Sequence, residues 1–183
     1  MSEEKSQSGQ NAQIDRKNLI KAITYIAIII AIMGIVWLLP RVALGTSTPF
    51  FSVSSESMVP TLNVGDYIVV KYQPFNELKV GDIIVFYSPI NPNDIIVHRI
   101  NDTKIFTGQE VLITKGDNNL YPDPWYVEQE HYIGKYTGFK IPYLGYLALL
   151  FPFPVNYIFI IIVILIIFLI EFLPEKKENK VES

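Results

Sequence analysis

The chain has 183 residues, enough for one modest domain accompanied by membrane segments. Its 15 basic and 18 acidic residues give a formal net charge of −3, and this balance lacks the basic surplus of a nucleic-acid-binding protein. The chain has no cysteine and only two histidines. Disulfide scaffolds, thiol nucleophiles and thiolate metal sites are therefore excluded, and a histidine-rich metal site is disfavoured.

The first 44 residues combine a polar segment with an apolar one. Residues 1–18 are rich in Ser, Glu, Gln and Lys and predict a disordered tail. Residues 19–44 predict a transmembrane helix, because about twenty apolar residues cross a hydrocarbon core. A cleavable signal peptide is the alternative, since Ala43-Leu44-Gly45 resembles a cleavage site. The long polar leader and the length of the apolar run favour the anchor.

A second apolar block occupies residues 143–171 and predicts another transmembrane segment, with a kink at Pro152 and Pro154. Basic residues near apolar segments mark the cytoplasmic side of a membrane. They precede the first segment and recur in the tail, residues 172–183, as Arg16, Lys17, Lys21, Lys176, Lys177 and Lys180. The pattern predicts a two-pass protein of the cell membrane, with both termini in the cytoplasm and the middle of the chain outside.

The middle of the chain, residues 45–142, predicts a β-rich domain. Runs of β-branched and aromatic residues occur there between Gly, Asn, Asp and Pro, at residues 66–71, 82–87, 95–100 and 111–114. No helical periodicity of useful length is found between the two apolar blocks. The fold class is therefore mainly β, anchored by two transmembrane α-helices.

The segment Ser54-Ser55-Glu56-Ser57-Met58-Val59-Pro60-Thr61 is on its own typical of a solvated loop. A hydrolytic site needs a serine, a base that takes its proton and a carboxylate that orients the base. His98, in a predicted strand, supplies a candidate base. The Gly-Asp-Asn-Asn turn at residues 116–119 supplies a candidate carboxylate. His98 could instead be a hydrogen-bonded structural histidine, and His131 is interpreted as a surface residue.

Lys115 is a rival base, because a desolvated lysine can also activate serine. It lies next to the Gly-Asp turn, and burial would have to remove its charge before it could accept a proton at neutral pH. An imidazole needs no such adjustment, and this favours His98.

Four segments resemble, in order, the motifs of type I signal peptidases. Residues 55–61 follow the Ser-x-Ser-Met-x-Pro-Thr box, and residues 65–70 resemble the Gly-Asp strand after it. His98-Arg99 stands where the bacterial branch has Lys-Arg, which resembles the archaeal and endoplasmic-reticulum branch. Residues 114–119 with Asp123 resemble the acidic box of that branch. Beyond these four, residues 142–145 also resemble the segment before its second span.

The resemblance implies a signal-peptidase-like β domain and a membrane-bound serine endopeptidase that cuts exported preproteins after small residues. Ser57 would be the nucleophile and His98 the general base. Asp117 and Asp123 are both candidates for the acidic partner, with Asp123 preferred and Asp117 assigned to ordering the turn. Such a mechanism supplies its own nucleophile and base, so no metal or organic cofactor is expected.

The same family box implies further roles around the nucleophile. Ser55 would help to bind the oxyanion together with the backbone N–H of Ser57, and Met58 and Pro60 would contact the substrate. The expected partners are the signal peptides of preproteins, the lipid membrane, and export machinery or accessory subunits.

Two aromatic pairs flank the predicted site, Phe50 with Phe51 and Trp125 with Tyr126. Single aromatic rings usually fill a β core. Because these pairs bracket the site, we interpret them as an interfacial rim that holds it at the level of the lipid headgroups.

Two non-enzymatic alternatives remain. A catalytically silent, membrane-tethered β module could bind or scaffold exported proteins, but it would not need serine, histidine and aspartate in this arrangement. A small subunit of a translocation complex would be expected to carry polar groups inside its spans. Neither apolar block has an ionisable residue in its middle, which disfavours a conduction path.

Overall fold

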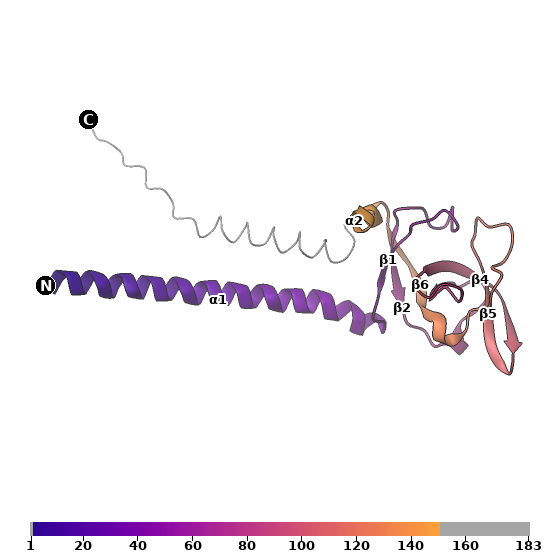
Figure 1. Cartoon of the computed structure of the whole chain (residues 1–183), viewed down its shortest axis with the longest axis horizontal. Helices are drawn as coiled ribbons and strands as arrows, with labels where there is room; N and C mark the ends of the chain where they lie inside the picture. The colour runs from indigo at the N-terminus through magenta and orange to yellow at the C-terminus, as the bar shows by residue number, and fades with distance from the viewer. Residues whose placement is uncertain (1, 151–183) are drawn as a thin grey trace, which may run out of the picture.

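The computed structural model describes residues 2–150, which form one long helix and a β domain (Figure 1). The helix, α1 (Ser2–Leu44), projects away from the domain. Within the described residues, Ile23–Leu44 is the one helical segment that is long and apolar enough to cross a membrane. This confirms the predicted N-terminal apolar helix.

The polar leader differs from the expectation. Residues 2–18 continue α1 instead of forming the predicted disordered tail. They contain no proline and one glycine, and Lys, Glu, Gln and Ala are good helix formers. Extending an existing helix also costs much less than nucleating a new one. The apolar segment thus provides a helix that the leader can prolong.

The second apolar block is described only at its start, as α2 (Leu144–Leu150). The rest of the predicted second span, including Pro152 and Pro154, and the predicted tail at residues 172–183 lie outside the described residues. The second transmembrane segment therefore stays a prediction.

The β domain is built on one six-stranded antiparallel sheet with the strand order β1-β2-β6-β3-β4-β5. Two short 3-10 helices, η1 (Phe75–Glu77) and η2 (Gln129–His131), connect its parts. The strands are β1 (Phe50–Ser52), β2 (Tyr67–Lys71), β3 (Ile83–Tyr87), β4 (Ile95–Phe106), β5 (Gln109–Lys115) and β6 (Tyr132–Ile141). The four predicted strands match β2 to β5, whereas β1 and β6 were not predicted.

Strand β3 explains how this sheet can hold two cores. Ile83 and Val85 join one buried cluster, and the alternate residues Ile84 and Phe86 join another. Successive side chains of a strand point to opposite faces, so both faces of β3 are covered. The first cluster also contains Met58, which ties the loop after β1 to the core.

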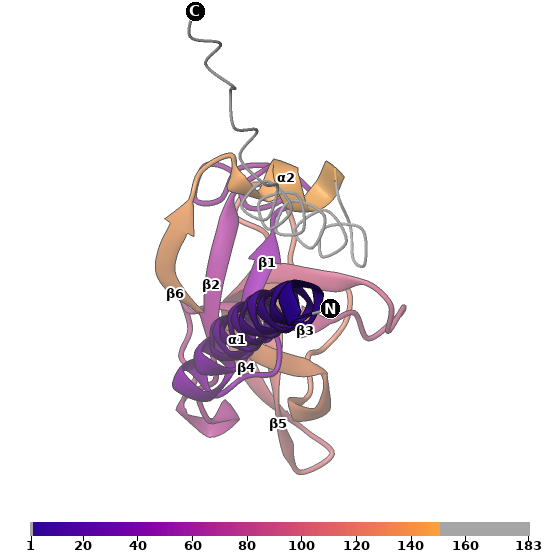
Figure 2. The ribbon, with the colours of Figure 1, turned by 90° about the vertical axis from the view of Figure 1, so that its left-hand side faces the viewer.

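The ends of the domain differ in their distance from α1. α2 lies against β1. Both are on the side of the domain from which α1 projects (Figure 1), with α2 and the domain end of α1 at different heights on that side (Figure 2). The β4–β5 hairpin lies at the opposite end (Figure 1). If α1 crosses a membrane, β1 and α2 are therefore the parts of the domain closest to it.

Candidate active site

The loop that carries Ser57 is held by the turn that follows β5. The backbone N–H of Asn118 donates to the Ser57 carbonyl over 2.8 Å, and its side chain donates to the Glu56 carbonyl over 3.2 Å. A Cβ on Gly116 would stand only 2.6 Å from the Ser57 carbonyl oxygen, so this close approach requires glycine. With Met58 buried in the core below, the loop is fixed from two sides.

The Ser57 hydroxyl has a second hydroxyl beside it. Ser55 Oγ lies 3.2 Å from Ser57 Oγ, and either oxygen can donate the hydrogen bond. Ser57 is half-buried and Ser55 is exposed. The loop that carries Ser57 therefore presents two adjacent hydroxyl groups.

His98 is placed by β4, where it pairs with Ile84 of β3, and it is only 6% exposed. Its Nδ1 lies 2.6 Å from Oδ2 of Asp123. Thr114 of β5 donates its hydroxyl to the same carboxylate oxygen over 2.6 Å. Because a carboxylate only accepts hydrogen bonds, Nδ1 carries a proton and Nε2 remains as the acceptor nitrogen of the neutral ring.

Asp123 is itself anchored to the sheet edge. Its backbone N–H donates to the Thr114 carbonyl over 2.8 Å, and its side chain is 5% exposed. The chain from β5 therefore returns to the strand it left and brings the carboxylate back to His98. A buried carboxylate held by two partners is suited to orient an imidazole.

Ser57, His98 and Asp123 line one cleft with a volume of about 300 Å³. One wall is formed by residues 52–55, at the end of β1 and just after it, and the other by residues 95–98 of β4. Met58 also lines the cleft although it is almost completely buried. Pro60 is exposed and is not among the residues that line it.

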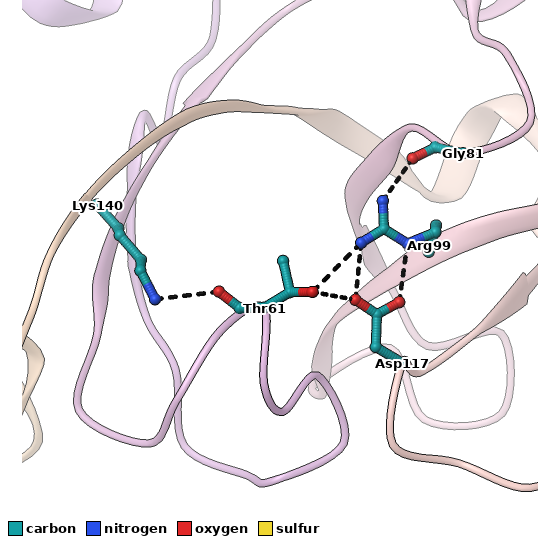
Figure 3. Close-up of polar contacts among 5 residues, drawn as sticks. All are labelled: Thr61, Gly81, Arg99, Asp117 and Lys140. Atoms are coloured by element: carbon teal, nitrogen blue, oxygen red, sulfur yellow. Dashed lines mark hydrogen bonds and ion pairs between the residues drawn. The ribbon is translucent and has the colours of Figure 1, made fainter.

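Asp117 has different partners from Asp123 (Figure 3). Arg99 donates to both of its oxygens, from Nε over 2.8 Å and from Nη2 over 2.7 Å, and Nη1 of Arg99 donates to the Gly81 carbonyl over 2.7 Å. Thr61 donates its hydroxyl to Asp117 Oδ2 over 2.5 Å. The hydrogen bonds from Arg99 lower the pKa of Asp117 despite its partial burial, and those to Asp117 raise the pKa of Arg99.

Thr61 is also held from its other side, by β6 (Figure 3). Lys140 Nζ donates to the Thr61 carbonyl over 3.0 Å and lies 2.6 Å from Oδ2 of Asp66. That carboxylate is buried and also accepts the backbone N–H of Asn63 over 2.9 Å. Thr61, in the loop that carries Ser57, is thus linked to Arg99 of β4 through Asp117 and to β6 through Lys140.

The other sequence candidates lie away from the cleft. Lys115 lines a separate cleft of about 280 Å³ together with Arg99 and Asp117. His131 lies in η2, with Nε2 3.9 Å from Glu130. Neither of them is among the residues that line the Ser57 cleft.

The four aromatic residues have different packing partners, and the interfacial rim that they are predicted to form stays a prediction. Phe50 stacks on Tyr67, with ring centroids 5.7 Å apart, and Phe51 packs against the first core cluster. Trp125 packs against the second core cluster and lines the Ser57 cleft. Tyr126 contacts Phe106 of β4, with ring centroids 5.4 Å apart.

Two groups of the site were not anticipated. Thr114 is a fully buried polar residue in the apolar strand β5, and a threonine at such a position is the signal that could have found it. Lys140 and Asp66 are 74 residues apart in the chain, and no spacing in the sequence indicates their ion pair.

Comparison with known proteins places the chain in a family. The family model described as "Signal peptidase, peptidase S26" matches residues 17–137. The signal peptidase complex catalytic subunit sec11 of Sclerotinia sclerotiorum is 34% identical over 134 residues, which cover 68% of this chain and 76% of that protein. The SEC11 subunit of Schizophyllum commune is 30% identical over 157 residues, which cover 73% and 80%.

A bacterial relative is similar over a shorter stretch. Signal peptidase I W of Bacillus subtilis is 39% identical over 92 residues, or 50% of this chain and 47% of that protein. The alignment thus spans about half of the bacterial relative but about three quarters of the fungal subunits. The chain belongs to the signal peptidase family, peptidase S26, and is a signal peptidase of the serine endopeptidase type.

Proposed function

We propose that Ser57, His98 and Asp123 form the catalytic triad of this signal peptidase. The observation that carries the proposal is the 2.6 Å contact between His98 Nδ1 and Asp123 Oδ2, in the same cleft as Ser57. This contact leaves Nε2 of His98 free of the proton and able to take one from a serine hydroxyl. Asp117 is given a structural role, because Arg99 occupies both of its oxygens.

The reaction follows the chemistry of a serine protease. Ser57 Oγ forms a bond to the carbonyl carbon of the scissile peptide while its proton passes to Nε2 of His98. As the tetrahedral intermediate collapses, the C–N bond breaks and His98 gives that proton to the leaving amine. A water molecule then attacks the acyl-enzyme, and its proton passes through His98 to release Ser57.

The oxyanion is bound by the backbone N–H of Ser57 and the hydroxyl of Ser55. The 3.2 Å distance between the two serine hydroxyl oxygens supports this role for Ser55, since it keeps a donor next to the reacting carbonyl. Met58, which closes the cleft from the core side, is the residue of the family box that contacts the substrate. Pro60 was also predicted to contact the substrate. It is exposed and does not line the cleft, so no observation supports that contact.

The substrates are the signal peptides of exported preproteins, cut after small residues. A cleft of about 300 Å³ that lies between two extended segments fits an extended peptide with short side chains. The β domain acts on the outer face of the membrane, with both termini in the cytoplasm and α1 as the first of two spans. Because the fungal relatives are named catalytic subunits of a complex, accessory subunits are proposed as partners.

The test is cleavage of a preprotein with an Ala-x-Ala site by purified wild type and Ser57→Ala in lipid or detergent. We expect wild type to cut after the second alanine. Ser57→Ala should not cut, although it is folded to the same extent as wild type. Labelling of Ser57 by a serine-directed phosphonate checks the nucleophile without a substrate. Cleavage by Ser57→Ala at the wild-type rate would refute the assignment, and a folded wild type that neither cuts nor labels would favour a non-catalytic binding module.

A further inference from the structure

We propose that Asn119 binds the main chain of the preprotein next to the scissile bond, through its side-chain amide. The inference rests on the proposed function, because it assumes that the Ser57 cleft receives the substrate. It assigns a substrate-positioning role to a residue that lies outside the triad and the oxyanion donors.

Asn119 lies in the cleft beside the nucleophile. It is half-buried and lines the same cleft as Ser57, His98 and Asp123. A Cβ on Gly116 would stand 2.9 Å from Asn119 Nδ2 and 2.6 Å from the Ser57 carbonyl oxygen. The amide and the main chain of the nucleophile therefore crowd the same point from two sides.

The side chain of Asn119 has no hydrogen-bond partner within residues 2–150. Its neighbour Asn118 differs, because it donates to Glu56 and holds the nucleophile loop. Within these residues no protein group competes for the Asn119 amide, so its donor and acceptor are available to a substrate in the cleft.

The backbone of Asn119 is fixed by hydrogen bonds, so the point from which its side chain enters the cleft is set before substrate arrives. Its N–H donates to the Gly116 carbonyl over 3.0 Å, and the N–H of Asn118 donates to the Ser57 carbonyl. The bend is further fixed by Gly116, where no side chain fits. A backbone that is already fixed reduces the entropic cost of ordering this segment when substrate binds.

The chemistry of an amide matches an extended peptide. One carboxamide has N–H donors and a carbonyl acceptor, and each residue of an extended peptide offers one C=O and one N–H. Asn119 can therefore pair with a single substrate residue whatever its side chain. This suits an enzyme whose substrates share a main-chain conformation and small residues, but little other sequence.

The test measures binding without catalysis. The affinity of a fluorescent signal peptide with an Ala-x-Ala site is compared between Ser57→Ala and Ser57→Ala/Asn119→Leu in detergent micelles. Leucine keeps the size of asparagine and removes both hydrogen bonds, so we expect binding about tenfold weaker, the effect of about 1.4 kcal/mol. The matched control is Asn76→Leu in the same Ser57→Ala background, at an exposed position of η1 outside the Ser57 cleft. It should bind the peptide as tightly as Ser57→Ala alone.

A second measurement separates substrate binding from loop support. In the chain that retains Ser57, Asn119→Leu should keep the wild-type rate of labelling by a small phosphonate that lacks a peptide. Asn119→Asp keeps the hydrogen-bond acceptor and loses the donor, so it should also bind the peptide more weakly. This variant replaces Asn119→Leu in the binding test if the leucine variant does not fold. Asn118→Ala, by contrast, should slow the labelling because it loosens the nucleophile loop.

Unchanged peptide binding in both Asn119 variants would overturn the proposal. So would a parallel loss of phosphonate labelling, because it would mean that Asn119 only supports the loop. Failure of the proposed function looks different: the wild type would not label at Ser57, whereas the peptide-binding comparison would still report on Asn119.

Discussion

The two aspartates of the acidic box are six residues apart, yet each has its own partners. Asp123 is on the His98 side of the β5 edge, where Thr114 and the imidazole share one of its oxygens. Asp117 is on the other side, where Arg99 and Thr61 occupy both of its oxygens. The sequence could supply both candidates, but the side on which each one lies depends on the path of the turn between them.

This difference predicts opposite effects for two isosteric substitutions. In Asp123→Asn the side chain can donate to Nδ1 and favour the wrong tautomer of His98, so kcat should fall by a factor of about 10³–10⁴ with little loss of stability. Asp117→Asn should keep much more activity and lower stability instead. The measurements are single-turnover cleavage and urea unfolding. Equal losses of kcat in both variants would contradict the separation of roles.

The pH dependence of stability provides a second test of Asp117. Its folded-state pKa is lowered from the ordinary value of 3.8, first by the hydrogen bonds from Arg99. A lowered pKa means that the stabilisation is present above pH 3.8 and is lost as the pH falls through the folded-state pKa. The urea midpoint of wild type should therefore drop on acidification below about pH 4. In Asp117→Asn this drop should be smaller, and an equally steep drop would show that other carboxylates dominate.

At the scale of elements, the strands that could be predicted are those whose sequence is uninterrupted. β2 to β5 contain β-branched runs, and β3 is apolar at consecutive positions because both of its faces are covered. β6 escaped prediction because Gly134 and Gly138 break its pattern. Gly134 is required by packing, since a Cβ there would stand 2.6 Å from the Val70 side chain and 2.8 Å from the Lys71 carbonyl oxygen of β2.

β1 and α1 illustrate two other limits of sequence reading. β1 has three residues, too few for a periodic signal, and its place at the sheet edge depends on pairing with β2. The polar start of α1 has no amphipathic pattern, and its helical state follows from continuity with the apolar helix behind it. Neither property is encoded in the segment alone.

The ion pair between Lys140 of β6 and Asp66, the residue before β2, predicts a large stability effect. In Lys140→Met, Asp66 keeps the hydrogen bond from Asn63 but loses its counter-charge while its side chain stays 4% exposed. Removing one partner of such a pair should cost about 3 kcal/mol of unfolding free energy. Lys104→Met, an exposed position of β4, should change it by less than about 0.5 kcal/mol. Similar urea midpoints for the two variants would mean that the pair contributes little.

At the scale of the whole molecule, α2 and the end of β6 offer a candidate for the surface that faces a membrane, besides the aromatic pairs around the site. α2 lies on the side of the domain from which α1 projects (Figure 1). α2 and the end of β6 carry exposed apolar side chains, namely Phe139, Ile141, Tyr143, Tyr146, Leu147 and Leu150. α2 is seated firmly on the domain, because the backbone N–H of Gly145 donates to the Gly65 carbonyl over 2.8 Å. Gly65 is in the turn just after the nucleophile loop, so the depth of α2 fixes the depth of the cleft.

This arrangement predicts that membrane contact and chemistry can be separated. Replacing Phe139, Leu147 and Leu150 with serine should reduce cleavage of a preprotein embedded in vesicles at least severalfold, because apolar area buried in the interface stabilises seating by about 25 cal/mol per Å². Cleavage of a short soluble peptide in detergent should be unchanged. The matched control is Ile105→Ser with Phe106→Ser, two exposed apolar residues on the hairpin farthest from α1. If the hairpin variant lost vesicle activity and the α2 variant kept it, the domain would have to face the membrane with its opposite end, and α1 would have to bend sharply after Leu44 to allow it.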